Sequence, residues 1–328
     1  MGQKLEISHR TVLYIVFLAG AVWLLTRLSD ILLMLFVSLI LMSALKPSID
    51  RLEGLKIPRA LSIFIVYLGM WIVVGFILAG VVPSLVEQTG KMIGLIPYAI
   101  NRIDLFPEYQ QEVTREALSW LGSLPQGLLK FSIDLFGNII NVLTTVVITF
   151  YLLLERKKLG HYLNSLFGDK KSKVISTLVD RIEHRLGSWV RGELILMLAI
   201  GLLTYLGLTI LGVDIALPLA IIAGLLEIIP NIGPIVSAVP AVIIALMSHP
   251  FLGIATAALY FLVQLFENNF LVPKVMQSTV GINPVISIIS LMIGFRLAGP
   301  SGAILAIPFV IILQVLISEF WRKEQGGN

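Results

Sequence analysis

The stretch from Leu194 to Ser318 constrains the fold of this chain more than any other feature of the sequence. Over these 125 residues only five side chains carry a charge: Asp214, Glu227, Glu267, Lys274 and Arg296. A soluble domain has about 25% charged residues, whereas this 328-residue chain has 13%, with 57% hydrophobic residues and a mean hydropathy of +0.94. Strands of alternating polarity are absent. We therefore predict an all-α, polytopic membrane protein with about eight spans.

Lysine and arginine concentrate in alternate loops between the apolar runs, which predicts a topology. Segment 155–193 holds nine of them, whereas segment 83–134 holds four against six acids. Because basic residues stay on the cytoplasmic side of short loops, both termini are expected in the cytoplasm. The predicted parts are, in order, a three-helix transmembrane region (1–82), an outer amphipathic helical segment (83–134), a transmembrane helix (135–154), a basic cytoplasmic amphipathic segment (155–193), a transport core (194–320) and a cytoplasmic tail (321–328).

Proline and glycine interrupt the apolar helices of the transport core twice. The pieces 215–229 and 235–248 are shorter than the roughly 20 residues that cross the hydrocarbon, and Pro230-Asn231-Ile232-Gly233-Pro234 separates them. A second short piece, 284–298, precedes the break Gly299-Pro300-Ser301-Gly302. The predicted topology gives the two units opposite orientations, a pattern that indicates the binding site of a secondary transporter.

Whether these interrupted units cross fully or re-enter stays open, because eight spans with partial hairpins and ten short crossings both fit the charge pattern. Each break leaves backbone N–H and C=O groups without their helical partners. Such breaks are therefore tolerated where they face protein or a wet cavity. The expected helix-break and hinge residues are Pro230, Gly233, Pro234, Pro240, Pro273, Gly299, Pro300, Gly302 and Pro308.

Polar side chains beside the breaks are the candidate binding and coupling residues. A carboxylate at bilayer depth costs several kcal/mol unless it is paired, solvated or protonated, so Glu227 and Glu267 indicate a proton- or cation-binding role. Arg296 is the expected counter-charge. A purely structural Glu227–Arg296 ion pair and an interfacial position for Glu267 are the alternatives. The predicted substrate- or ion-binding and coupling residues are Glu227, Asn231, Gln264, Glu267, Asn268, Asn269 and Arg296.

The motif EIIPNIGP at 227–234 resembles the signature of the autoinducer-2 exporter family, a family of predicted permeases. Two later stretches fall in the matching order, FENNFLVPKVMQSTVGINPV at 266–285 and GFRLAGPSGAILAIPF at 294–309. The resemblance implies a multi-helix, homo-oligomeric permease of the bacterial or archaeal cytoplasmic membrane. The positions that match the motifs are Glu227, Pro230, Gly233, Pro234, Glu267, Asn268, Pro273, Gly281, Pro284, Gly299, Pro300, Gly302 and Pro308.

Members of that family have been linked to export of a furanone-type quorum-sensing molecule and to exchange of monovalent cations for protons. We expect a secondary transporter of a small polar solute, coupled to a proton or cation through buried carboxylates. A monovalent cation (Na⁺, Li⁺ or K⁺)/proton antiporter is the alternative, and a non-transporting membrane scaffold is a further one. Expected partners are the solute or ion, membrane lipids and further copies of the chain.

Other functions are not expected. No histidine lies within an apolar run, and neither H-E-x-x-H nor G-x-S-x-G occurs, so the nucleophile–base pairs and metal ligands of a hydrolase are missing. The chain has no cysteine, which excludes disulfides and thiolate sites. We predict no enzyme activity, no cofactor, no metal site and no binding to nucleic acid.

Overall fold

Nearly all the residues that the structure describes lie in helices, and no strand occurs among them. This confirms the predicted all-α class. The expected outer segment at 83–134 lies outside the described residues, apart from isolated positions. The structure is a computed structural model that describes residues 9–75, 139–213, 215–230, 232–276 and 283–325, with single positions at 79, 83, 115 and 119.

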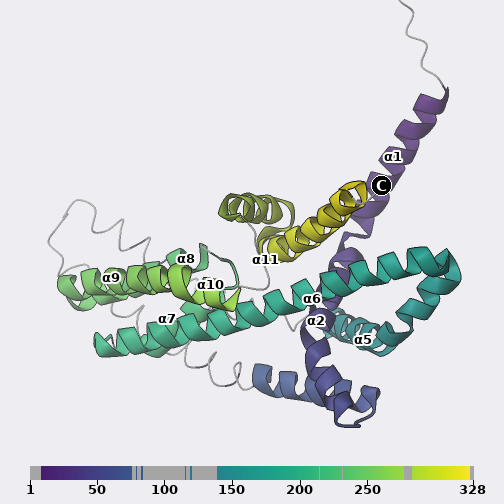
Figure 1. Cartoon of the computed structure of the whole chain (residues 1–328). Coiled ribbons are helices and arrows are strands. Elements are labelled where there is room, and N and C mark those ends of the chain that lie inside the picture. The colour runs from purple at the N-terminus through teal and green to yellow at the C-terminus, as the bar shows by residue number, and fades with distance from the viewer. Residues whose placement is uncertain are drawn as a thin grey trace, which may run out of the picture.

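The N-terminal half is a three-helix bundle with one helix projecting from it. Helix α1 (His9–Arg27) extends away from the rest of the molecule, and α2 (Ser29–Gly54) follows it (Figure 1). Helix α2 packs with the helix Arg59–Gly75 and with α5 (Ile139–Glu155). The buried side chains that these three helices share are Met42, Ile49, Ile63, Tyr67 and Leu153.

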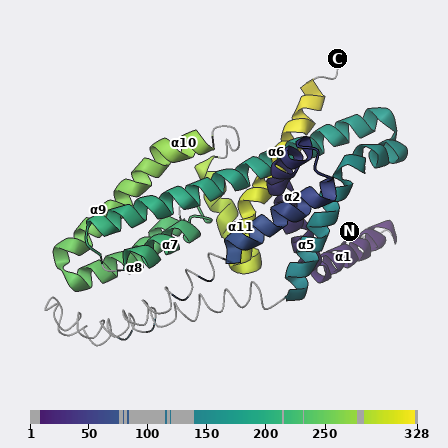
Figure 2. The same cartoon turned by 90° about the horizontal axis from the view of Figure 1, so that it is seen from below.

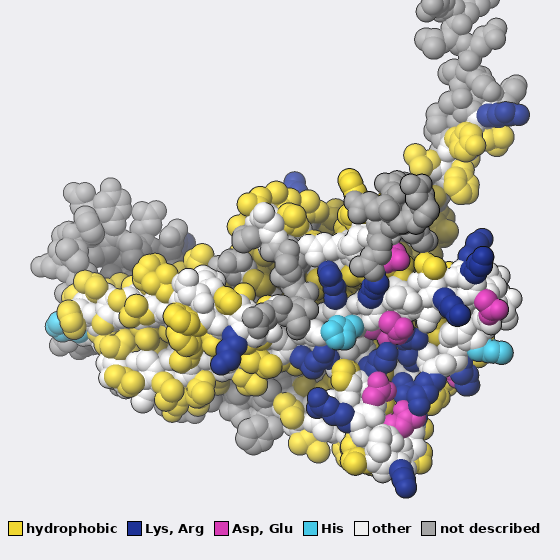
Figure 3. Space-filling model, viewed as in Figure 1, with side chains coloured by type: hydrophobic (Ala, Val, Ile, Leu, Met, Phe, Trp, Pro, Cys, Tyr) yellow, Lys and Arg dark blue, Asp and Glu magenta, His cyan; other side chains and the backbone are white. Residues whose placement is uncertain are grey.

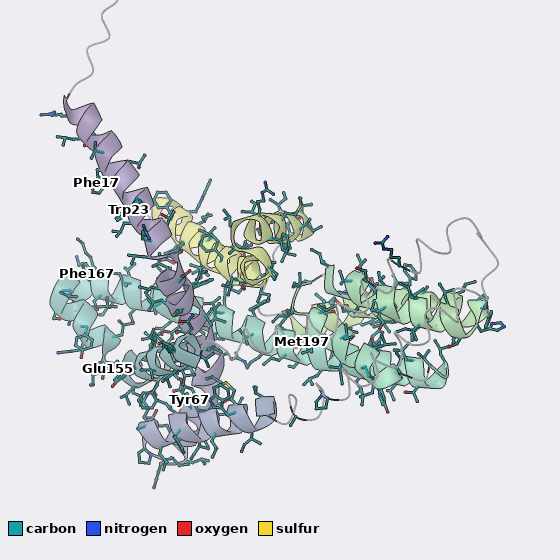
Figure 4. The ribbon with its side chains drawn as sticks, turned by 180° about the vertical axis from the view of Figure 1, so that it is seen from behind. Phe17, Trp23, Tyr67, Glu155, Phe167 and Met197 are labelled. Carbon is teal, nitrogen blue, oxygen red and sulfur yellow. The ribbon has the colours of Figure 1, made fainter. Side chains whose placement is uncertain are left out.

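Helix α6 (Leu159–Ile210), which follows the 3₁₀ turn η1 (Arg156–Lys158), joins the two halves of the molecule. It kinks at Gly168, whose φ of 73° and ψ of 167° suit a residue without a Cβ. Beyond the kink it runs the length of the molecule, from the turn near Phe167 past Met197 into the C-terminal half (Figure 4). The helix continues through the expected boundary at 193/194, so the basic segment and the start of the expected transport core form one helix.

The C-terminal half is built around a hairpin of two short helices, α7 (Ala216–Leu226) and α8 (Ile232–Ser248), which pack beside α6 and α9 (Pro250–Phe266) (Figure 2). At about 1.5 Å per residue α7 is roughly 16 Å long, about half of the hydrocarbon thickness of a bilayer. The hairpin therefore turns back inside the bundle. Its tip lies between Leu226 and Ile232, where the sequence predicts the first interruption.

The second interruption lies inside α11 (Pro284–Gln325), which follows the π-turn η2 (Glu267–Leu271) and α10 (Val272–Val275). Gly299 has a φ of 62° and a ψ of −147°, so the helix breaks there and restarts at Pro300. The two halves fold against each other so closely that a Cβ added to Gly294 or Gly302 would overlap the other residue's carbonyl. Pro240 and Pro308, by contrast, lie inside α8 and α11, and both helices continue through them.

The surface has two distinct regions. Apolar side chains cover the half formed by α7, α8 and α9, whereas charged side chains gather over α2, η1 and the first part of α6 (Figure 3).

Among the described residues, four stretches are long and apolar enough to cross a membrane: Ser29–Gly54, Ile140–Ile210, Pro250–Val275 and Val285–Trp321. The predicted number of spans stays a prediction.

The close approach inside α11 predicts that Gly302→Ala destabilises the fold. The added methyl has no room beside the Gly294 carbonyl, so the two halves of α11 must separate, which we expect to cost about 1–3 kcal/mol. Thermal unfolding of the purified protein in detergent measures the change. Gly69→Ala is the matched control, because Gly69 is helical with no atom within 4 Å of an added Cβ. That variant should match the wild type or gain up to about 1 kcal/mol; an equal loss in both variants would contradict the prediction.

Candidate functional site

Three buried carboxyl groups come together in the C-terminal half, and we call them the carboxylate cluster. Glu193 lies on α6, Glu227 at the C-terminal end of α7, and Glu267 at the first residue of η2. Their exposed fractions are 4%, 1% and 4%. The carboxyl groups of Glu227 and Glu267 are close enough to share a hydrogen bond, and Glu193 lies within electrostatic range of both.

Close backbone packing brings the end of α7 onto α6. A Cβ added to Gly224, one turn before Glu227, would lie 2.7 Å from the Met197 carbonyl oxygen. Small residues at such contacts let helix backbones approach closely in membrane proteins. Glu227 therefore reaches the level of Glu193 on α6, and the chain then turns through Pro230 into α8.

A proline explains the unusual turn that carries Glu267. Pro273 has no N–H to donate to the carbonyl four residues earlier. The preceding turn widens, and the Val272 N–H bonds to the Glu267 carbonyl, the i to i−5 pattern of a π-turn. Such turns recur at functional sites. Glu267 is buried in this turn, and Gln264 Nε2 donates a hydrogen bond of 3.1 Å to its Oε2.

The cluster has no cationic partner among the described residues. Arg296, the expected counter-charge, is exposed on α11 and forms no ion pair in the described part of the chain. Glu193 Oε1 and Glu227 Oε2 are buried without a hydrogen-bond partner. Adjacent carboxyl groups in an apolar setting cannot all stay ionised without compensation. The arrangement therefore suits a bound proton or a small cation.

Three further buried hydroxyl groups lie on α6 and α9, the helices that carry or precede two of the acids, and we call them the hydroxyl row. It consists of Thr204 on α6 and of Thr256 and Tyr260 on α9, each buried with its oxygen unpartnered among the described residues. Tyr260 belongs to the apolar core that α6 to α9 share. Tyr260 lies seven residues from Glu267, roughly 10 Å along the helix. Thr204 lies eleven residues from Glu193, roughly 16 Å along α6.

The structure brings together only some of the residues that the sequence nominates. Glu227, Gln264 and Glu267 meet in one place. Asn268 and Asn269 are exposed, and Asn269 Nδ2 donates to the Leu265 carbonyl at 2.7 Å. Asn231 lies outside the described residues, as do Asp214 and Gly281.

Glu193 is the functional candidate that the sequence analysis did not include. It was assigned to the basic segment because it lies one residue before the long stretch of low charge. A signal for it exists, since Trp189, Leu196 and Ile200 recur at helical spacing and place position 193 on the same face. All four are buried in the structure.

Comparisons with known proteins place the chain among transport proteins. A family model described as AI-2E family transporter matches residues 12–322. The chain is 26% identical to Putative transport protein YrrI of Bacillus subtilis (strain 168), over 92% of this chain and 89% of that protein. It is 28% identical to YueF of the same strain, over 83% and 79%. It is 24% identical to YhhT of Escherichia coli (strain K12), over 92% and 86%.

Paired cysteines test whether Glu227 and Glu267 meet. The chain has no cysteine of its own, so a Glu227→Cys/Glu267→Cys variant should cross-link internally with a short bifunctional thiol reagent. Met247 lies between the two positions, so cyanogen bromide fragments remain joined only when the link has formed. Glu227→Cys/Asn269→Cys is the control, because Asn269 is exposed. Efficient linkage in the control but not in the first pair would refute the assigned geometry.

Proposed function

Because the chain belongs to the AI-2E family of transporters, we propose that it is a secondary transporter whose coupling site is the carboxylate cluster. It moves a small polar solute, such as a furanone-type signalling molecule, across the cytoplasmic membrane of a bacterium or archaeon. The single observation that carries the proposal is a set of three acids, each less than 5% exposed, contributed by the tip of an interrupted hairpin, by α6 and by η2. Interrupted helices beside intramembrane acids are typical of secondary transporter sites.

The cluster couples ion binding to movement through electrostatic repulsion. When it is empty, ionised carboxyl groups repel one another across the contact between the hairpin tip and η2. A proton or a monovalent cation removes that repulsion and allows Glu227 to approach Glu267. The ion thereby favours one position of the hairpin relative to α6 and α9, which is how a ligand shifts a conformational equilibrium.

The hairpin tip connects the cluster to the second interruption. Ile229, two residues after Glu227, packs against the apolar core that includes Leu291 and Ala303 on the two halves of α11. A displacement of the tip therefore changes the packing of both interrupted units together. The backbone groups that these breaks free supply hydrogen-bonding partners for a polar solute.

The hydroxyl row provides the route between the cluster and the end of the bundle near His249. A hydroxyl group both donates and accepts hydrogen bonds, so Thr204, Tyr260 and Thr256 can pass a proton or solvate a small cation. Buried polar groups without partners are costly, which favours a functional reason for three of them in one apolar core. Exchange of a monovalent cation for a proton is the second candidate function, favoured by acids that have no cationic partner in the described part of the chain.

Neutralising single acids of the cluster tests the coupling role. Glu227→Gln and Glu267→Gln keep the side-chain size but lose the titratable group, so we expect ion-coupled transport to fall by about tenfold or more. The assay is solute uptake into everted membrane vesicles under an imposed proton gradient. Asp169→Asn is the control, since Asp169 is an exposed acid on α6. Wild-type transport in both Gln variants would remove the coupling role.

The same vesicles separate the two candidate functions. An antiporter changes the internal pH when Na⁺, Li⁺ or K⁺ is added alone, and both Gln variants should abolish that response. A carrier of a polar organic solute gives no response to the cation alone and shows counterflow of a labelled furanone-type solute instead.

Removing the Tyr260 hydroxyl separates a functional role from a structural one. Tyr260→Phe deletes a buried oxygen that has no hydrogen-bond partner, so stability should stay within about 1 kcal/mol of the wild type or rise. We expect proton-coupled flux to fall several-fold in the same variant. Tyr205→Phe is the control, because Tyr205 is exposed on α6. Unchanged flux with Tyr260→Phe would exclude the hydroxyl row from the route.

A further inference from the structure

A cavity of about 320 Å³ lies between α2 and α6 in the charged half of the molecule, and we call it the Arg191 cavity. Helices α2 and α6 form its walls. It adjoins a larger cavity of about 600 Å³, with which it shares Lys46, Asp50 and Asp180. Its lining residues are Ser43, Lys46, Pro47, Asp50, Asp180, Glu183, His184 and Arg191.

Each acid that lines the cavity already binds a cation other than Arg191. Asp50 Oδ1 lies 3.2 Å from Arg59 Nη1. Asp180 Oδ1 lies 2.7 Å from Arg156 Nη2. Glu183 binds Lys46 Nζ at 2.7 Å and also accepts from Arg156 Nε. The acids of this wall are therefore matched by cations from α2, from η1 and from the first residue of the helix Arg59–Gly75.

Arg191 has no acidic partner among the described residues. Its Nη2 donates to Ser188 Oγ at 3.1 Å, and its Nη1 is buried without any acceptor. A second cation, Arg51, which is not among the residues that line the cavity, acts electrostatically on Arg191 and forms no ion pair in the described part of the chain either. Two uncompensated guanidinium groups beside one cavity leave a local excess of positive charge.

The packing of α2 against α6 holds Arg191 in this position. One turn before Arg191, a Cβ added to Gly187 would overlap the Ser43 carbonyl oxygen, so the two backbones are in contact there. The same added Cβ would lie 3.1 Å from Arg191 Nη1, so the guanidinium occupies the space that the missing side chain leaves. The guanidinium is thus held between two helices, and Arg191 lines the cavity with its Nη1 buried and unpartnered among the described residues.

We propose that the Arg191 cavity is an anion site that binds a phosphate group. A guanidinium fork donates parallel hydrogen bonds to two phosphate oxygens, and Arg51 compensates the second negative charge. His184, which is exposed at the rim, adds a further donor. The phosphate belongs either to a free phosphate or to a lipid headgroup, since basic pockets between helices bind anionic headgroups. This site is independent of the proposed transport mechanism.

Two binding arms identify the source of the phosphate, using the purified full-length chain. In the first arm, thermal unfolding in a neutral detergent is followed while inorganic phosphate replaces chloride at constant ionic strength; a bound ligand raises the unfolding temperature. In the second arm, the protein in phosphatidylcholine nanodiscs is compared with the protein in nanodiscs that also contain phosphatidylglycerol. A response to phosphate indicates a free-phosphate site, and a response only to phosphatidylglycerol indicates a lipid site.

The variants decide whether the response belongs to this cavity. Arg191→Gln should lose the response that the wild type shows, whereas Lys173→Gln, which removes an exposed cation from the same helix, should keep it. Arg191→Lys keeps the charge without the fork and should bind about tenfold more weakly or worse. Arg51→Gln leaves Arg191 intact and should also weaken binding. It therefore serves as the test variant if Arg191→Gln does not fold. No response in either arm, or an equal response in the Arg191 variants and the wild type, would overturn the proposal.

Discussion

The desolvation of carboxyl groups in an apolar bundle is the constraint on which the rest of this structure depends. Glu193, Glu227 and Glu267 are almost fully buried, and an uncompensated charge there would cost several kcal/mol. The surrounding fold is arranged to bring them together. A glycine contact sets α7 against α6, the break after Leu226 ends a helix at Glu227, and Pro273 creates the π-turn that carries Glu267. The glycine contact, the helix break and the π-turn each make a regular helix less stable. Together they cost folding free energy that a purely structural bundle would not need to lose.

The two halves of the protein handle charge in opposite ways. In the half that contains α2, η1 and the start of α6, acids and bases are matched in a network that links Lys46, Arg156 and Glu183. In the C-terminal half, the three buried acids have no cationic partner among the described residues. Matched charges fix helices in place, whereas unmatched ones need a mobile partner from solution. This contrast supports a division between an anchoring half and a transporting half.

The sequence predicts which helices form better than it predicts which faces of those helices meet. Long apolar runs, short pieces and proline–glycine breaks are local properties, so the all-α class and both interruptions could be read from composition and spacing. The opposite charges of Glu227 and Arg296 suggested an ion pair, because sequence cannot reveal which helix faces which. The structure instead places Arg296 on an exposed face and puts like charges together. The sequence did not predict a role for Glu193 for a related reason, since the basic amphipathic segment that contains it continues without a break into the buried face of α6.

The continuity of α6 makes the molecule mechanically one body. From the kink at Gly168 to Ile210, the helix is roughly 60 Å long at about 1.5 Å per residue. If a helix of that length tilts as a rigid body by about 5° at its charged end, its opposite end moves by roughly 5 Å, close to one helical turn. A tilt of α6 would therefore displace both halves together through one continuous helix.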